Sequence, residues 1–284
     1  MLLLAQKETF MRYIGAHVSA SGGLEKAVER AKAIGCNSLQ LFSGSPRVWK
    51  RKDLDQVETS KMFSLRDEYN FGPVFTHSLY LVNLASPNPE LLEKSLRVLK
   101  YDMAFDSKIK GSGIVVHLGS HLGAGWEAVR DDVAAHISEI LKDSPDDATF
   151  LIENSAGQKG KLCSNLEEIK WLFDHISSPK LGWCFDTCHA HAAGYDLLTV
   201  GDEISRLGLW KDLKCIHVND SRDDFDSGRD RHENLGKGNI AEADFKHFLN
   251  LPEVAEIPMI LEVPGLDGNG PDAPNIEVLK SYVE

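Results

Sequence analysis

Short apolar runs alternate with longer amphipathic stretches along the whole chain. Apolar runs of about four to six residues are typical of buried strands, and apolar positions at helical spacing form one face of a helix. Residues 23–34 show such a helical pattern, and Gly35 is suited to end that helix. The predicted strands are residues 13–18, 38–42, 74–78, 113–118, 149–153, 181–186, 214–219 and 258–263. The predicted helices are residues 23–34, 54–69, 89–107, 127–141, 165–175, 197–207, 243–250 and 274–282.

The regular alternation of strand and helix predicts an α/β fold. Strand–helix units that repeat without a low-complexity linker favour a (β/α)8 TIM barrel in a single domain. A doubly wound parallel sheet is the alternative. We assign residues 11–284 to the barrel and residues 1–10 to an N-terminal extension, which is too short for a signal sequence or a membrane span.

Composition places few limits on function. The hydrophobic fraction of 42% and the charged fraction of 26% are those of an ordinary globular protein. The formal charge of −12 argues against broad, non-specific binding of nucleic acid, but three divalent cations would halve it. The odd number of cysteines, without a CxxC pair, indicates reduced thiols and a cytoplasmic protein. No apolar run is long enough for a transmembrane segment.

Histidines and acids stand at the ends of most predicted strands. In a barrel these ends meet on the C-terminal face, where active sites lie. His17 ends the first strand, and Asp230 and His232 stand two apart in the long loop 221–239, so they project to the same side of an extended segment. The candidate metal ligands are His77, His117, Glu153, Asp186, His189, His217, Asp230, His232 and Glu262.

Nine donors are too many for one zinc ion, which takes about four, and they suit two or three ions with a bridging carboxylate. Clustered metals favour the hydrolysis of phosphate esters, because they activate water and neutralise charge on the attacking and leaving oxygens. Cys188 beside His189 could instead suggest a thiol nucleophile, but a small buried residue at a strand end explains this cysteine better.

The chain resembles the endonuclease IV family of apurinic/apyrimidinic endonucleases over almost its whole length. Eight motifs occur in the order expected for that family. They are GAHVSASGG at 15–23, HSLYLVNLAS at 77–86, VVHLGSH at 115–121, ENSAGQKG at 153–160, FDTCHAHAAGYD at 185–196, HVNDS at 217–221, DRHENLGKGNI at 230–240 and LEVPG at 261–265.

The resemblance implies a monomeric enzyme that cuts duplex DNA on the 5′ side of an abasic site, leaves a 3′-hydroxyl and trims blocked 3′ ends. It implies three zinc ions, with manganese able to substitute, and a metal-bridging hydroxide that attacks phosphorus. Glu153 and Glu262 would position and polarise this water. The first ion would be held by His77, His117 and Glu153, the second by Glu153, Asp186, His217 and Glu262, and the third by His189, Asp230 and His232.

The resemblance also implies DNA-contacting residues. Arg47, Tyr80 and Leu81 match positions at which the family penetrates and bends the duplex. An aromatic and an apolar side chain can replace unstacked bases, although from the residues alone packing of Tyr80 and Leu81 at a strand end is the preferred interpretation. Lys159, Lys161 and Lys237 are candidate phosphate contacts and equally plausible surface residues. The chain departs from the family pattern at Leu118, usually proline, and at Glu233, often histidine.

Two other functions remain open. A sugar isomerase or epimerase on the same barrel would use one or two divalent ions, but would have no evident need for Asp230 and His232 or for a wedge at Tyr80 and Leu81. A non-catalytic zinc or DNA-damage binding module would carry the same ligands without turnover. Metal stoichiometry separates the first alternative from the nuclease, and incision of abasic DNA separates the second.

Overall fold

The computed structural model describes residues 12–283, and within this range eight parallel strands close into a barrel. β1 pairs with both β2 and β10, so the sheet has no free edge and the doubly wound alternative is wrong. The barrel strands are β1 Ile14–His17, β2 Ser38–Phe42, β3 Val74–His77, β4 Ile114–Val116, β5 Phe150–Glu153, β6 Leu181–Asp186, β7 Leu213–His217 and β10 Met259–Leu261.

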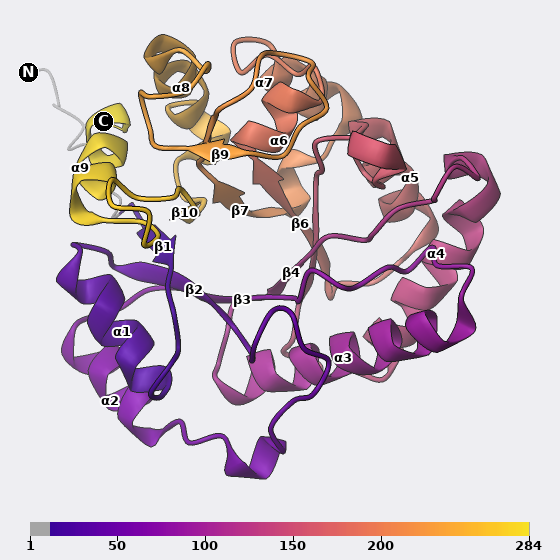
Figure 1. Cartoon of the computed structure of the whole chain (residues 1–284), viewed down its shortest axis with the longest axis horizontal. Helices are drawn as coiled ribbons and strands as arrows, with labels where there is room; N and C mark the ends of the chain where they lie inside the picture. Colours follow the sequence, from indigo (N-terminus) through magenta and orange to yellow (C-terminus); the bar gives the residue numbers. More distant parts are fainter. Residues whose placement is uncertain (1–11, 284) are drawn as a thin grey trace, which may run out of the picture.

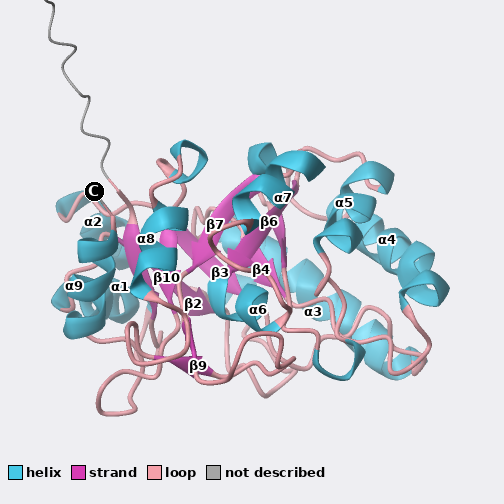
Figure 2. Cartoon of the chain, turned by 90° about the horizontal axis from the view of Figure 1, so that it is seen from above, coloured by secondary structure: helices cyan, strands magenta, loops and turns pink. Residues whose placement is uncertain are grey.

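The helices lie around the outside of the strands (Figure 1). Viewed from above, α1, α2 and α9 lie at one end of the molecule and α3, α4 and α5 at the other (Figure 2). The helices are α1 Leu24–Ala33, α2 Ser60–Glu68, α3 Pro89–Lys108, α4 Trp126–Lys142, α5 Leu166–His175, α6 Thr187–Ala192, α7 Val200–Leu207, α8 Glu242–Leu249 and α9 Ala273–Tyr282. Short 3-10 turns occur at Leu54–Gln56, Gln158–Gly160, Trp210–Asp212 and Pro252–Val254.

The (β/α)8 barrel and all of its strands agree with the sequence prediction, but some connections differ. The helix predicted over 54–69 begins only at Ser60, because the chain is extended at Val57 after a single 3-10 turn. Helix α6, directly after β6, is absent from the prediction. Its residues are all buried, so it has no solvent-exposed face and no amphipathic pattern. The loop 221–239 also contains part of a ribbon, β8 Asp220–Ser221 with β9 His232–Glu233.

Alternation along the strands positions the candidate ligands above an apolar floor. Residues two apart on a strand point to the same side. Phe75, Val115, Leu151, Cys184, Cys215 and Ile260 form one buried layer inside the barrel. Two positions after each residue of this layer comes a candidate ligand, at or directly after the C-terminal end of the strand. These ligands are His77, His117, Glu153, Asp186, His217 and Glu262.

The N-terminal extension predicted for residues 1–10 lies outside the described residues. All five cysteines lie inside the described range, and each is buried and unpaired, as expected for reduced thiols. None of the helices between residues 12 and 283 is long and apolar enough to cross a bilayer.

A buried acid beneath the barrel wall gives the fold a pH dependence. Asp106 of α3 accepts a hydrogen bond from Thr76 Oγ1 at 2.7 Å, and burial raises the pKa of its carboxyl from 3.8 to about 7. Between these values the folded state keeps a proton that the unfolded state has released. The free energy of unfolding therefore falls as pH rises through this window, by up to about 1.4 kcal/mol per pH unit.

We expect Asp106→Asn to remove this loss, because an amide cannot ionise. The stability of the variant relative to the wild type should rise between about pH 4 and 7 and then level off. Urea unfolding at pH 5, 6 and 8 measures this difference. A difference that does not change with pH would contradict the raised pKa of Asp106.

Candidate metal centre

The nine predicted ligands meet at one mouth of the barrel, beside a cavity of about 520 Å³. They form three groups, and within each group the ligand atoms lie within 4.8 Å of one another. The groups are His77, His117 and Glu153; Glu153, Asp186, His217 and Glu262; and His189, Asp230 and His232.

Glu153, at the end of β5, joins the first two groups and is fully buried. Its Oε2 lies 3.4 Å from His77 Nε2 and 3.2 Å from His117 Nε2. Its Oε1 lies 3.0 Å from His217 Nδ1. The two oxygens of one carboxylate therefore face two different sets of nitrogen atoms, as a bridging ligand requires.

The second group occupies the ends of β5, β6, β7 and β10. His217 Nδ1 lies 3.3 Å from Glu262 Oε2 and 3.8 Å from Asp186 Oδ2. Asp186 also caps α6, since its Oδ1 accepts a hydrogen bond from the backbone N–H of His189 at 2.8 Å. The same residue thus places His189 over the mouth of the barrel.

The third group combines α6 with the long loop. His189 Nε2 lies 3.0 Å from Asp230 Oδ1, and His232 Nε2 lies 3.6 Å from the same oxygen. Arg231, between the two loop ligands, donates instead to the carboxylate of Asp223. The loop ligands therefore share one side of an extended segment, as predicted from their spacing.

Asp220 anchors the loop that carries this third group. Its carboxylate accepts backbone N–H groups from Gly236 at 3.0 Å, Gly238 at 2.9 Å and Ile240 at 3.0 Å. At Gly238 a Cβ atom would lie 2.4 Å from Asp220 Oδ1 and 2.3 Å from the Ser221 carbonyl oxygen. The close approach therefore requires glycine.

Main-chain carbonyls orient three of the five imidazoles. A carbonyl oxygen only accepts, so the ring nitrogen bonded to it must carry the hydrogen. In each case this nitrogen is Nδ1, so in the neutral ring Nε2 is bare and available to the group of ligands. The pairs are His77 with Ser78 O (2.7 Å), His189 with Asn154 O (3.0 Å) and His232 with Glu262 O (3.4 Å).

Known proteins share this arrangement. A family model described as a xylose isomerase-like TIM barrel matches residues 28–282. A probable endonuclease 4 from Methanoculleus marisnigri is 39% identical, with 94% of this chain and 97% of that protein covered. A probable endonuclease 4 from Halothermothrix orenii is 36% identical, with 94% and 99% covered. The chain belongs to the endonuclease IV family.

A solved structure supports the same assignment. Endonuclease IV from Thermus thermophilus superimposes with a TM-score of 0.84 at 33% identity, covering 95% of this chain and 98% of that one. A D-tagatose 3-epimerase-like protein reaches 0.74 at 21% identity, which shows the shared fold alone. The predicted family and barrel are confirmed, and with them the prediction of an endonuclease-type hydrolase.

The electrostatics of this endonuclease IV site lower the pKa of three of its carboxyls, those of Glu153, Asp230 and Glu262. Burial acts to raise the pKa of Glu153, but the imidazoles of His117 and His217 hold that pKa well below its usual value. Burial lowers the pKa of His117 to about 4. At His189 burial is outweighed by Asp186 and Asp230, which raise its pKa to about 10. The mouth is therefore a concentration of negative charge balanced mainly by imidazoles.

The donor set fits zinc. Donor atoms that share one tetrahedral zinc at about 2.0–2.1 Å lie roughly 3.3 Å apart. The Glu153 contacts of the first group, at 3.2 and 3.4 Å, match this separation. Among the described residues, Glu153 Oε2 and His232 Nε2 are buried without a hydrogen-bond partner. Glu153 Oε2 faces His77 Nε2 and His117 Nε2, and His232 Nε2 faces Asp230 Oδ1. Buried polar atoms without hydrogen bonds are costly unless they bind a cation.

Three amides that hold the ligands have no signal in the sequence. Asn154 Oδ1 accepts the backbone N–H of Asp186 at 2.6 Å. Asn219 donates to Asp186 Oδ2 at 2.7 Å and accepts the backbone N–H of Glu262 at 2.8 Å. Gln40 lies within hydrogen-bond distance of His217 and Glu262. Amides of this kind fix the orientation of metal ligands.

The candidate DNA-contacting residues lie together at the rim. Tyr80 is 60% exposed and Leu81 is 40% exposed. The Tyr80 ring also packs against Phe42 at the end of β2, with ring centroids 5.5 Å apart, as the alternative interpretation of packing at a strand end expects. Arg47 is exposed, and its neighbour Pro46 accepts the backbone N–H of Tyr80 at 3.3 Å. Of the loop lysines, Lys161 lies 3.5 Å from Asp230 Oδ2, whereas Lys159 and Lys237 are exposed.

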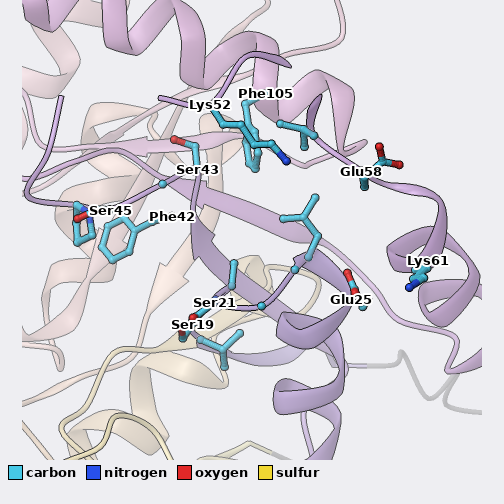
Figure 3. Close-up of a pocket in the computed structure, with 18 of the residues that line it drawn as sticks. Ser19, Ser21, Glu25, Phe42, Ser43, Ser45, Lys52, Glu58, Lys61 and Phe105 are labelled. Carbon is cyan, nitrogen blue, oxygen red and sulfur yellow. Dashed lines mark hydrogen bonds between the residues drawn. The ribbon is translucent and has the colours of Figure 1, made fainter. Parts of the chain in front are cut away.

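A larger cavity, of about 1030 Å³, lies between the β1–α1 loop and the β2–α2 connection and shares His17 with the metal centre. Figure 3 shows Ser19 and Ser21 on one side of it and Lys52 and Phe105 on the other. None of the clustered metal-binding groups found between residues 12 and 283 lies there. The three ligand groups therefore adjoin the smaller cavity.

Proposed function

We propose that this chain hydrolyses the phosphodiester bond 5′ of an abasic site in duplex DNA, leaves a 3′-hydroxyl, and trims blocked 3′ ends. The observation that carries the proposal is the third ligand group, His189 with Asp230 and His232, beside the two groups that share Glu153. The probable endonuclease 4 relatives and the endonuclease IV from Thermus thermophilus support the same conclusion.

We propose that the three groups hold three zinc ions, with manganese able to substitute. When bound, such ions lower the pKa of water and neutralise charge on a phosphate in displacement. Glu153 and Glu262 would position and polarise the attacking water, since both belong to the second group and Glu262 lines the cavity. His117, of the first group, and His189, of the third, lie side by side, with ring centroids 5.3 Å apart.

The rim residues would recognise the lesion. Tyr80 and Leu81 can fill space left by unstacked bases, and Arg47 can occupy the gap in the stack. The exposed lysines and Lys161 would contact phosphates. Bound divalent ions would offset the formal charge of −12 locally, so a net acidic chain is compatible with a DNA substrate.

We expect Tyr80→Ala and Arg47→Ala to weaken binding to abasic duplex by roughly tenfold each, because stacking on one base contributes about 1–3 kcal/mol. Zinc content should not change, since neither residue belongs to a ligand group. Fluorescence anisotropy with a tetrahydrofuran-containing duplex measures the affinity, and intact duplex serves as control. Affinity equal to wild type in both variants would remove these residues from the lesion-reading set.

The experiment that tests the function is incision of a duplex with a single tetrahydrofuran abasic analogue. The product should be a nick 5′ of the analogue whose 3′ end a DNA polymerase can extend. A duplex without the analogue should stay intact. Zinc-loaded protein that binds the lesion but never cuts would favour the non-catalytic binding module.

The epimerase alternative rests on fold alone, since the epimerase-like neighbour is 21% identical. Metal analysis separates the two: about three zinc ions per chain support the nuclease, and one or two manganese or magnesium ions support the epimerase. We also propose that the chain acts as a monomer in the cytoplasm. Light scattering of the zinc-loaded protein tests the monomer.

A further inference from the structure

Gln40 lies in the middle of β2 with its side chain fully buried beneath the metal centre. Its amide has three polar neighbours. Gln40 Nε2 lies 2.6 Å from Glu262 Oε1 and 2.9 Å from His17 Nδ1. Gln40 Oε1 lies 2.8 Å from His217 Nε2. A polar side chain in the wall of a barrel therefore spans three residues at the mouth.

The carboxylate of Glu262 determines which way this amide faces. An ionised carboxylate only accepts hydrogen bonds, so the atom of Gln40 next to Glu262 Oε1 must be the NH2 group. Glu262 belongs to the second ligand group, and a carboxylate must be deprotonated to bind a metal ion. The carbonyl oxygen of Gln40 then necessarily faces His217 Nε2.

This orientation in turn selects the tautomer of His217. Because Gln40 Oε1 only accepts, His217 Nε2 must carry the hydrogen and Nδ1 is left bare in the neutral ring. His217 Nδ1 is the atom that faces Glu153 Oε1 at 3.0 Å and Glu262 Oε2 at 3.3 Å. His217 therefore offers Nδ1 to the ligand group, whereas His77, His189 and His232 offer Nε2, because their Nδ1 atoms are hydrogen-bonded to main-chain carbonyls.

We propose that Gln40 is a positioning residue that presents His217 Nδ1 and Glu262 Oε2 to the second ligand group. The proposal rests on the proposed metal centre. One amide performs both tasks. It hydrogen-bonds His217 Nε2 and Glu262 Oε1, and thereby leaves the other donor atom of each residue, His217 Nδ1 and Glu262 Oε2, facing the ligand group. Gln40 does not touch the substrate, and its effect passes through the two ligands.

A spectrum of the wild-type protein tests the first half of the proposal. Long-range ¹H–¹⁵N correlation spectra of zinc-loaded protein distinguish a protonated ring nitrogen from a metal-bound one. We expect His217 to be protonated at Nε2 and His77, His189 and His232 at Nδ1. A spectrum with His217 protonated at Nδ1 would overturn the proposal without any substitution.

Two variants test the second half. Gln40→Leu removes both hydrogen bonds, and should weaken binding of one zinc ion by roughly 10–100-fold, the usual effect of losing a partner of a metal ligand. Gln40→Glu can still accept from His217 Nε2 but its ionised carboxylate cannot donate to Glu262. The Gln40→Glu variant should therefore keep the His217 tautomer and still lose zinc affinity. A merely structural role of Gln40 would not separate these two results.

Ser38→Ala is the matched control, since Ser38 is a buried polar residue of the same strand whose hydroxyl donates to the Pro73 carbonyl instead. Zinc affinity is measured by chelator competition, without DNA. Zinc affinity in Gln40→Leu equal to that of Ser38→Ala would overturn the proposal. Failure of the wild type to cut abasic DNA would instead count against the proposed function and leave this outcome unaffected.

Discussion

Glu153→Gln is expected to lower the rate of incision at abasic sites by roughly 10³-fold or more, the scale of loss when a group that stabilises charge in the transition state is removed. Glu153 faces His77 and His117 with one oxygen and His217 with the other. A glutamine keeps the shape of this side chain. It offers one neutral oxygen and an NH2 group, which cannot bind a cation, so the bridge between the first two groups is lost.

The fold should survive this substitution, because the apolar layer beneath Glu153 is unchanged. Incision of the tetrahydrofuran duplex, zinc content and thermal unfolding are measured on the same preparation. Glu233→Gln is the control, since Glu233 lies on β9 beside the ligand His232 but accepts from Arg222 and belongs to none of the three groups. Incision by Glu153→Gln at the rate of Glu233→Gln would refute the bridging role.

The parts of the site that the sequence predicts are those with a local pattern. At β5, Leu151 points into the barrel and Glu153 follows two residues later, so one strand signals both the core and the ligand. The same spacing repeats on the neighbouring strands, and parallel strands end on one face. The convergence of ligands far apart in the chain therefore follows from the register of short apolar runs.

The remaining features depend on partners that no local pattern reveals. Gln40 sits in an apolar strand, and its role depends on His217 and Glu262, which lie 177 and 222 residues away in sequence. Helix α6 is buried all round, so it lacks the separate solvent-exposed and apolar faces by which a helix is recognised in a sequence. Its start is set by Asp186, which serves both as helix cap and as candidate ligand.

Removal of zinc is expected to abolish incision and to lower the midpoint of thermal unfolding. The mouth holds four acidic side chains, Glu153, Asp186, Asp230 and Glu262, of which the first two are fully buried. Without cations these carboxylates repel one another in a largely buried site. An ion present at 100 times its Kd stabilises the folded state by about 2.7 kcal/mol, and several ions together should shift the midpoint by at least about 5 °C.

The protein is dialysed against a strong chelator and then against chelator-free buffer, and zinc is measured before each assay. Nicking of the tetrahydrofuran duplex should disappear and should return on addition of about three equivalents of zinc. Magnesium should not restore it, because Mg²⁺ prefers octahedral oxygen ligands and binds imidazole poorly. Chelated protein that holds no zinc yet cuts and unfolds like the untreated protein would eliminate the metal centre, and with it the proposed mechanism of hydrolysis.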